Sequence, residues 1–482
     1  MVFSSPIFLL LFLPVVLGLY QFTPGPLKNL VLLLSSLVFY GWAEPVFVVL
    51  MLTSIVLNYL FGLWLSGARR DRHNVLALAV VANLGLLVYF KYANFLAGNL
   101  SGLLNRLGLP TIELPDIALP IGISFFTFQA MSYIFDVYRG DAEVQKNPIN
   151  VALYIALFPQ LIAGPIVRYG SVAAQLVQRS VDLDGFAYGV RRFIIGLGKK
   201  VLIANSVAVV ADEIFAQPTS SMPLGVAWLG IICYTLQIYF DFSGYSDMAI
   251  GLGRMFGFRF PENFNYPYVS ASITEFWRRW HISLSSWFRD YLYIPLGGNR
   301  GRPWRVYVNL LTVFTLCGLW HGAQWTFLVW GLYHGAFLIL ERIAPAGPLA
   351  GVPKPFKHVY ALLVVMVGWV FFRAASFAEA LVYLQAAAGL NGAGVGWGQV
   401  VTHVDSVVAL ALVAGCLGSL PLVPMMKSFD QRLSDRPAGS GQPGLLDSIR
   451  AFGGVLVLLL IFAASVMSVS AETYNPFIYF RF

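Results

Sequence analysis

Long apolar runs separated by short polar or basic segments dominate the chain. The run 35–65 contains one charged residue, Glu44, and the run 75–89 contains none. Because about 20 apolar residues are enough for a helix to cross the hydrocarbon core of a bilayer, such runs predict membrane-spanning helices. The predicted spans are 6–22, 28–42, 45–65, 75–92, 117–138, 186–212, 224–240, 305–319, 324–341, 358–372, 404–422 and 451–469.

Two further stretches carry features that are unfavourable in a lipid-facing helix. Proline and glycine interrupt the apolar segment Pro148–Pro165, and Phe240–Phe260 carries Asp241 and Asp247 among four glycines. Irregular backbone is tolerated at membrane depth only where protein or a water-filled cavity surrounds it. We therefore expect both stretches to be broken or re-entrant segments that line an interior cavity.

The composition supports a membrane protein and excludes a soluble globular domain. Hydrophobic residues make up 58% of the 482 positions and charged residues only 11%, whereas soluble domains carry about 25% charged residues. No Lys or Arg precedes the first apolar run, Pro6–Tyr20, so it is interpreted as a retained helix and not as a signal peptide. The predicted fold is one all-α, polytopic transmembrane domain over 1–482, with N-terminal helices at 1–145, a catalytic core at 146–345 and C-terminal helices at 346–482.

The net charge of +8 arises from basic residues that gather in clusters. Such clusters are typical of the cytoplasmic loops of membrane proteins, and no readout residues indicate nucleic-acid binding. Placing the first cluster in the cytoplasm predicts that both chain termini lie outside. The clusters are Arg69–Arg72, Arg139–Lys146, Arg191–Lys200, Arg278–Arg305, Lys354–Lys357 and Lys427–Arg450.

Cysteine usage indicates neither a metal site nor a disulfide framework. The three cysteines, Cys233, Cys317 and Cys416, lie far apart in apolar sequence. No metal-ligand spacing links them to one another. They are expected to be inert packing residues, and no metal is expected.

The six histidines fall into two groups. His73, His358 and His403 lie at predicted span ends, where a solvated role is the default, whereas the other three lie in aromatic sequence. His321 stands at the junction of two apolar runs, in Cys-Gly-Leu-Trp-His-Gly-Ala-Gln-Trp. A polar ring there is unfavourable unless it faces a cavity with a partner, and imidazole suits proton transfer near neutrality. Composition alone leaves a functional and a packing role equally open for His321, and favours packing for His334.

His281 lies in an aromatic and basic segment, Glu275–Tyr293. On a helix, Trp277, His281 and Ser285 would share one face. An interfacial amphipathic helix with aromatic anchors accounts for the tryptophans and arginines here. It does not account for His281. Nor does it account for the loop Pro295–Gly301 that follows, which is glycine-rich but lacks a phosphate-loop pattern.

These motifs resemble the membrane-bound O-acyltransferase (MBOAT) family. The resemblance is carried by Trp-Arg-Arg-Trp-His at 277–281, by Pro-Leu-Gly-Gly-Asn-Arg at 295–300 and by Trp-His-Gly at 320–322. Residues 1–5, 158–165 and 237–251 resemble more specifically the bacterial alginate O-acetyltransferase branch. Relatives that acetylate cellulose or peptidoglycan have nearly the same motifs.

The resemblance implies a helical bundle pierced by a narrow tunnel, with the essential histidine, His321, near its centre and His281 as the second site position. It implies an acetyltransferase of the bacterial inner membrane that acts with periplasmic acetyltransferase partner proteins. The donor would be acetyl-CoA or another acetyl thioester, with no bound cofactor. Residues expected to hold donor or substrate are Trp320, Arg278, Arg279, Asn299, Arg300, Asp241 and Tyr245.

Two alternatives remain open at the level of sequence. Asp241, Tyr245 and Asp247 would also serve as purely structural groups that hydrogen-bond within a broken helix. The whole chain could instead be a non-catalytic conduit for an acyl carrier. The absence of a visible internal repeat and the histidine pair favour the enzyme.

Overall fold

The structure of the chain is a computed structural model that describes every residue except 69, 113, 344–350, 426–444 and 472–482. Most of the basic cluster expected at Lys427–Arg450 lies outside the described residues, as do Arg69 and the C-terminal end. Throughout the described residues the ordered elements are helices, and no strand occurs among them. The predicted all-α class is confirmed.

The first half of the chain holds the helices from η1 to α11. The N-terminal helices are η1 (Phe8–Phe12), α1 (Leu13–Phe22), η2 (Gly25–Leu27), α2 (Lys28–Gly41), α3 (Val48–Gly67), α4 (Arg72–Arg106) and α5 (Ile123–Arg139). The central helices up to α11 are α6 (Pro148–Ala156), α7 (Phe158–Leu161), α8 (Tyr169–Val177), α9 (Leu183–Gly198), η3 (Lys199–Ala204), α10 (Asn205–Ala216), η4 (Thr219–Ser221) and α11 (Leu224–Met255).

The second half of the chain continues in the same way. Its first helices are η5 (Pro267–Val269), α12 (Ile273–Arg279), α13 (Ile282–Phe288), η6 (Arg289–Tyr293), α14 (Pro303–His321) and α15 (Trp325–Ile343). The last described helices are α16 (Lys354–Arg373), α17 (Phe377–Ala387), α18 (Trp397–Thr402), α19 (Ser406–Gly418) and α21 (Leu445–Ala471).

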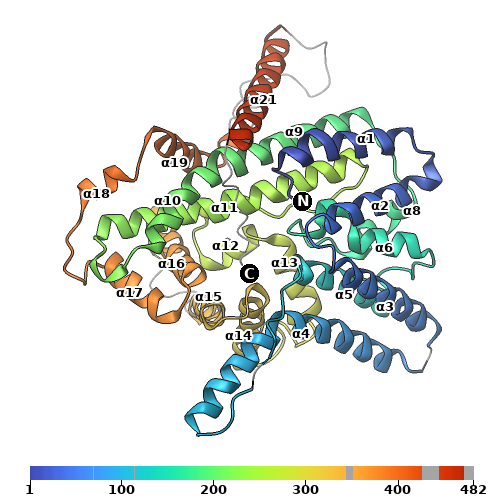
Figure 1. Cartoon of the computed structure of the whole chain (residues 1–482), viewed down its shortest axis with the longest axis horizontal. Coiled ribbons are helices and arrows are strands. Elements are labelled where there is room, and N and C mark those ends of the chain that lie inside the picture. Colours follow the sequence, from blue (N-terminus) through green and yellow to red (C-terminus); the bar gives the residue numbers. More distant parts are fainter. Residues whose placement is uncertain (69, 113, 344–350, 426–444, 472–482) are drawn as a thin grey trace.

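The helices form a bundle around a central group of short elements. α9 and α11 lie side by side along one edge, and α12, α13 and α14 lie near the middle (Figure 1). α21 contacts α9 and stands off that edge, while α4 reaches away from the bundle on the opposite side. The short central helices are thus enclosed by the longer ones.

Among the described residues, six helices are long and apolar enough to cross a membrane. They are Val48–Gly67, Arg72–Arg106, Leu183–Ala216, Leu224–Met255, Lys354–Arg373 and Ile449–Ala471. The other predicted spans also fold largely as helices, but these are shorter or less apolar. The multi-pass character is confirmed, whereas the complete set of crossings and their orientation stay predictions.

The first of the two stretches expected to be irregular is broken as predicted. α6 ends at Ala156, Leu157 adopts a non-helical conformation (φ −56°, ψ 113°), and the short α7 begins at Phe158. Pro159 lies in the first turn of α7, where the missing N–H of proline costs no helical hydrogen bond. The whole of Val151–Val167 is buried inside the protein.

The expectation for the second stretch is wrong. α11 runs without a break to Met255, so Asp241, Asp247 and most of the glycines lie in one regular helix. Two of these glycines, Gly244 and Gly251, are instead the points at which α9 approaches the helix. A Cβ on Gly244 would lie 2.7 Å from the carbonyl oxygen of Gly196, and one on Gly251 would lie 2.6 Å from that of Gly189.

The acidic residues of α11 are neutralised by cations of the helical run 183–216. Asp247 pairs with both Arg192 and Lys199, each at 2.6 Å. Asp241 pairs with Lys200 at 2.8 Å, and both of these side chains are almost fully buried. Part of the basic cluster Arg191–Lys200 therefore forms ion pairs between helices and does not act only as a cytoplasmic charge that orients the protein in the membrane.

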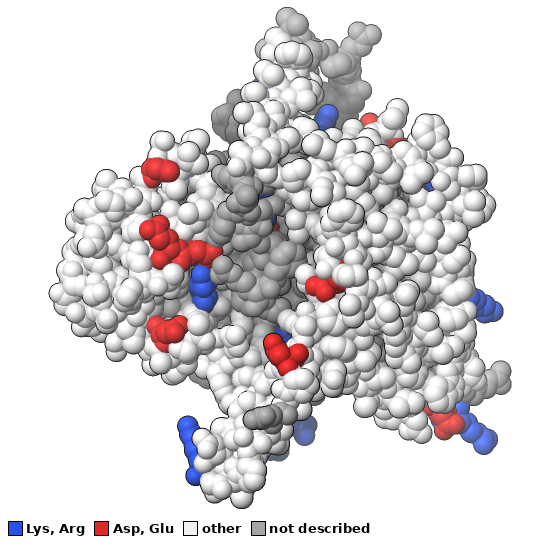
Figure 2. Space-filling view, viewed as in Figure 1, with Lys and Arg blue, Asp and Glu red and all other residues white. Residues whose placement is uncertain are grey.

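The surface has the character of a protein surrounded by lipid. Figure 2 shows a face that is almost entirely uncharged, with the few acidic and basic side chains scattered over it. Large apolar side chains are exposed along α3, α4 and α21. Cys233 and Cys317 are buried as expected, but Cys416 is exposed on α19, so its expected packing role is wrong.

Candidate active site

His321 is the last residue of α14, where the chain turns into α15. These two helices approach closely because glycines face each other across their contact. A Cβ on Gly318 would collide with the carbonyl oxygen of Phe327, and one on Gly331 would collide with that of Phe314. The tight crossing buries the His321 side chain, which is 4% exposed.

His281 lies between α12 and α13, in the left-handed backbone region (φ 43°, ψ 54°). The prediction that one helix places Trp277, His281 and Ser285 on a single face is therefore wrong. α12 ends at Arg279, and the N–H of Ile282 bonds to the carbonyl of Asn263 instead of continuing the helix. The break turns His281 into the centre of the bundle.

Asn263 holds this break in place. Its side-chain oxygen accepts hydrogen bonds from the N–H (3.2 Å) and the hydroxyl (2.8 Å) of Ser283, and its amide donates to Ser246 of α11 at 3.0 Å. Ser283 in turn accepts from the N–H of Ile166 at 2.9 Å. Since Asn263 is fully buried, the turn that carries His281 is fixed by contacts to three other segments.

α12 is also anchored to the helix that follows His321. The carboxylate of Glu341 on α15 accepts from the N–H groups of Ile273 (2.6 Å) and Thr274 (2.9 Å) and from the Thr274 hydroxyl. A carboxylate at a helix N-terminus satisfies N–H groups that have no partner within the helix. The Ser272 side chain caps the same end by accepting from the N–H of Glu275. The segment that carries His281 is therefore hydrogen-bonded to the helix that follows His321.

The imidazoles of His281 and His321 meet in the middle of the bundle, with ring centroids 6.4 Å apart. The indole of Trp320 lies beside both, at 5.8 Å from His281 and 5.0 Å from His321. Phe242 of α11 packs against His281 at 4.7 Å, and Phe372 of α16 packs against His321 at 5.2 Å. An aromatic shell of this kind keeps water away from the two rings.

His281 is a buried polar group whose bonding capacity is unused within the described part of the chain. The residue is fully buried, and neither ring nitrogen has a hydrogen-bond partner there. Buried polar groups in proteins are nearly always paired, so a ring with two unpaired nitrogens has capacity to bond a bound molecule; His334, equally buried, has the same unused capacity in this part of the chain.

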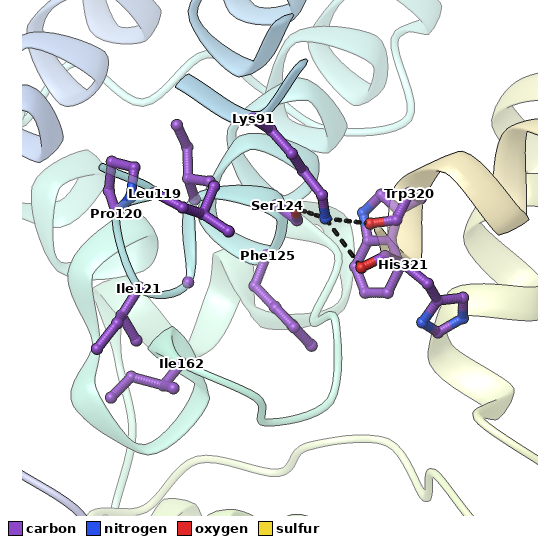
Figure 3. Close-up of a pocket in the computed structure, with 11 residues that line it drawn as sticks. Lys91, Leu119, Pro120, Ile121, Ser124, Phe125, Ile162, Trp320 and His321 are labelled. Atoms are coloured by element: carbon purple, nitrogen blue, oxygen red, sulfur yellow. Dashed lines mark hydrogen bonds between the residues drawn. The ribbon is translucent and has the colours of Figure 1, made fainter. Parts of the chain in front are cut away.

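A first cavity, called here the Lys91 cavity, lies at the Ile123 end of α5. It has a volume of about 80 Å³, and its lining includes Lys91, Ser124, Phe125, Trp320 and His321. Figure 3 shows the Lys91 ammonium meeting the main chain of α14 while the imidazole of His321 points away from it. The cavity reaches His321 from one side.

A second cavity, called here the Arg278 cavity, lies toward the other end of α5. It has a volume of about 440 Å³, and Arg278, Arg289 and Cys317 are among its lining residues. Arg139, the last residue of α5, donates to the carbonyl of Asp290, next to Arg289. The Lys91 cavity thus reaches α14 at His321, and the Arg278 cavity reaches it one turn earlier, at Cys317.

The basic residues expected at the donor site do not share one environment. Arg278 is exposed and lines the Arg278 cavity. Arg279 pairs with Glu275 at 2.9 Å and donates to the carbonyl of Asn265. Of these two arginines, Arg278 is the one that lines the Arg278 cavity.

The Asn299 and Arg300 loop lies at the rim of the same cavity. The Asn299 side-chain oxygen accepts from Tyr293, which lines the cavity, and from Arg342. Asn299 and Arg300 are both exposed. Their role toward a donor stays a prediction.

Asp241 and Tyr245 lie on α11 near the site but face other neighbours. Asp241 pairs with Lys200, and the ring of Tyr245 stacks on Phe3 at 4.6 Å. Phe242, which lies between these two residues in the sequence, packs its ring against His281. These contacts favour the structural interpretation of Asp241 over a direct substrate contact.

His334 is closer to the site than its position in the sequence suggests. It is fully buried on α15 among aromatic rings, with Trp330 at 5.1 Å and Trp277 at 5.2 Å. The Trp330 ring also contacts His321 at 5.1 Å. One indole therefore separates the two imidazoles.

Reasoning from the sequence missed two residues next to the histidines, Asn263 and Lys91. Asn263 lies in an irregular segment with no distinguishing pattern. Lys91, by contrast, is the one charged residue in the predicted span 75–92. An isolated ionisable residue within a membrane segment is a signal for a functional site, and it would have identified Lys91.

Comparison with known proteins identifies the family of the chain. The family model described as the membrane-bound O-acyltransferase family (MBOAT) matches residues 122–378, which is more than half of the chain. The chain belongs to the membrane-bound O-acyltransferase family. This span contains both histidines, Trp320, the Arg278 cavity and α11, while Lys91 lies outside it.

Similarity to individual bacterial proteins extends over the full length of the chain. The chain is 46% identical to the probable alginate O-acetylase of Azotobacter vinelandii and 44% identical to that of Pseudomonas aeruginosa, with both chains covered completely in each case. It is 38% identical to the peptidoglycan O-acetyltransferase of Helicobacter pylori over 81% of this chain and 80% of that one. The chain is an O-acyltransferase, and the resemblance found in its motifs is confirmed.

Proposed function

We propose that this protein is an O-acetyltransferase of the bacterial inner membrane that takes acetyl groups from a cytoplasmic thioester for the O-acetylation of exported alginate. The main support is the similarity over complete chains to alginate O-acetylases. The geometry is consistent with it, because the Lys91 cavity is lined by His321 and the Arg278 cavity by Ile282 and Cys317, which adjoin His281 and His321 along the chain.

His321 acts as the general base in this proposal. Its imidazole takes the proton of the acceptor hydroxyl while the hydroxyl oxygen attacks the carbonyl carbon of the acetyl thioester. The carbon–sulfur bond breaks, and the thiolate leaves with the proton from the imidazolium. An acetyl ester and a free thiol result. A variant of the scheme has the His321 ring carry the acetyl group between donor and acceptor.

His281 stabilises the reacting carbonyl. Its buried ring has no hydrogen-bond partner among the described residues and lies 6.4 Å from that of His321, so a carbonyl oxygen between them can accept a hydrogen bond from it. Donors fixed before the reaction are effective at such positions because no reorganisation is needed when charge develops. The surrounding aromatic shell limits hydrolysis of the thioester.

The Arg278 cavity receives the donor. Arg278 and Arg289 line it, and Asn299 lies at its rim. Acetyl-CoA is anionic, so these cations would raise its local concentration at the cavity mouth. No bound cofactor or metal is part of the scheme. Periplasmic acetyltransferase partner proteins would receive the acetyl group, or assist its transfer, on the far side.

The experiment is complementation of an alginate-producing host that lacks its own O-acetylase, with alginate acetyl content and membrane abundance measured together. Wild type should restore acetylation. His321→Ala and His281→Ala should reach the membrane but lower acetylation by about 10²–10⁴-fold, since general acid–base catalysis contributes that much. His73→Ala, at an exposed span end, is the matched control and should behave as wild type.

Two outcomes would overturn parts of the proposal. Normal acetylation by an abundant His321→Ala variant would exclude its catalytic role and favour the conduit alternative. Failure of wild type on alginate, combined with restored acetylation of peptidoglycan or cellulose in matching hosts, would show that the polymer assignment is wrong.

A further inference from the structure

The C-terminal end of α14 is held by two adjacent side chains of α4. The Lys91 ammonium donates to the main-chain carbonyls of Trp320 (2.5 Å) and His321 (3.2 Å). The hydroxyl of the next residue, Tyr92, donates to the carbonyl of Leu319 at 2.6 Å. Three consecutive carbonyls of the helix that carries His321 thus find their partners on one neighbouring helix.

These three carbonyls have no partner within α14. The last four carbonyls of any helix lack intrahelical donors, and in water the solvent satisfies them. At membrane depth water is excluded, so protein groups must do so. The negative end of the helix dipole also favours a cation at this position. An ammonium and a hydroxyl from α4 meet both requirements.

Burial of the Lys91 ammonium would be unfavourable if it did not bond these carbonyls. The residue is 8% exposed in the middle of an apolar helix, and ionisable groups in such helices are rare outside functional sites. Its third hydrogen bond goes to the Ser124 hydroxyl at 3.1 Å. All three N–H groups of the ammonium are therefore engaged with protein, so Lys91 holds the main chain and does not contact the reacting atoms.

We propose that Lys91 and Tyr92 form a clamp that fixes the last turn of α14 and thereby the position of the His321 imidazole. Lys91 is a positioning residue for acyl transfer, acting through the carbonyls of Trp320 and His321. The clamp couples α4, which lies outside the region matched by the family model, to the catalytic helix. This inference rests on the proposed catalytic role of His321.

The test uses the full-length protein in the same complementation assay, with acetyl content normalised to membrane abundance. Lys91→Met keeps an unbranched apolar side chain of nearly the same length and removes the three donors. Acetylation should fall about 100-fold, because a displacement of about 1 Å in a catalytic group has effects of that size. Lys91→Arg should recover a large part of the activity, since it restores a cation and the Lys91 cavity of about 80 Å³ leaves room for the larger head group.

A matched control separates positioning from general stability. Asn83 lies on the same helix, is 3% exposed, and exchanges hydrogen bonds of 2.9 and 3.0 Å with Asn58 of α3, away from α14. Asn83→Leu should lower the melting temperature in detergent and leave acetylation per molecule unchanged. Tyr92→Phe, which removes one hydroxyl, should lower acetylation about tenfold. If Lys91→Met does not accumulate in the membrane, the activity of Tyr92→Phe tests the clamp in its place.

The outcomes are distinguishable from failure of the proposed function. An active His321→Ala variant would remove the basis of the proposed function itself. An inactive His321→Ala variant together with Lys91→Met or Tyr92→Phe at wild-type activity would overturn the clamp alone. Loss of activity in Lys91→Met without recovery in Lys91→Arg, and with an equal loss in Asn83→Leu, would reduce Lys91 to a packing group and also overturn the clamp.

Discussion

His281 combines an unusual backbone conformation with a central position. It and Tyr266 are the two residues other than glycine with positive φ in the described chain. Such conformations cost about 1–3 kcal/mol and persist where surrounding contacts enforce them, often at functional sites. Here the bonds from Ser283 and Ile282 to Asn263 enforce it. The strain places the imidazole between α5, α11 and α14.

Two substitutions of His281 by small residues test the left-handed conformation, because the conformation decides which of the two variants is more stable. His281→Gly should be more stable than His281→Ala by about 1–2 kcal/mol, because glycine has no Cβ to clash in the left-handed region. In a regular helix the order would be reversed by about 1 kcal/mol. Thermal unfolding of both variants in detergent gives the difference, and a more stable alanine variant would contradict the left-handed turn.

At the same scale, the sequence identified some residues of the site and not others. His281 and His321 could be found because their flanking motifs resemble those of a known family. Asn263 could not, because its importance arises from contacts with Ser246 and Ser283 that exist only in the folded chain. Asp241 was recognised as unusual, but its partner Lys200 depends on how α9 packs.

Between elements, close helix crossings at glycine organise the part of the protein that surrounds the histidine pair. α14 crosses α15 at Gly318 and Gly331, and α9 crosses α11 at Gly196 and Gly244. The glycines of α11 were expected to break the helix, since propensity alone counts them as breakers. In membrane proteins small residues also let backbones approach one another, and this second effect prevails here. The break between α6 and α7 was predictable because proline restricts the backbone locally.

Alanine at a helix crossing should therefore lower the stability of the protein far more than alanine on a free helix face. In Gly244→Ala the new Cβ would lie 2.7 Å from the carbonyl oxygen of Gly196, and we expect a loss of about 1–3 kcal/mol of stability. Gly85→Ala on α4 is the control, because nothing lies within 4 Å of a Cβ there. It should gain about 1 kcal/mol from helix propensity. Melting temperatures of the two purified variants measure the contrast; equal effects would contradict the tight crossing.

The whole molecule assembles the site from distant parts of the chain. Lys91 and Phe125 come from the expected N-terminal segment 1–145, the histidines from 146–345, and Phe372 from 346–482. The apolar runs predicted the helices because burial in lipid requires helical hydrogen bonding whatever the packing. The arrangement of those helices was not predictable from the runs, since a lipid-facing and a core helix have similar composition.

The predicted orientation of the molecule can be tested on either side of α4. Ser66, near the end of α3, should be cytoplasmic, and Thr111, beyond α4, should be outside; both are exposed. In a background with Cys233, Cys317 and Cys416 replaced by serine, a membrane-impermeant maleimide should label Thr111→Cys in spheroplasts. It should label Ser66→Cys only after lysis, with reaction detected by a mass shift. The opposite pattern would invert the topology.

The ion pairs between the run 183–216 and α11 also constrain how the protein is made. Each lysine or arginine at the centre of a helix opposes its transfer into lipid by about 2.5–3.5 kcal/mol. Arg192, Lys199 and Lys200 emerge from the ribosome before Asp241 and Asp247 have been synthesised. The earlier helix therefore has to stay beside the translocon until the later one arrives. The two helices then enter the bilayer joined by these ion pairs, so membrane integration of this enzyme is already a tertiary folding step.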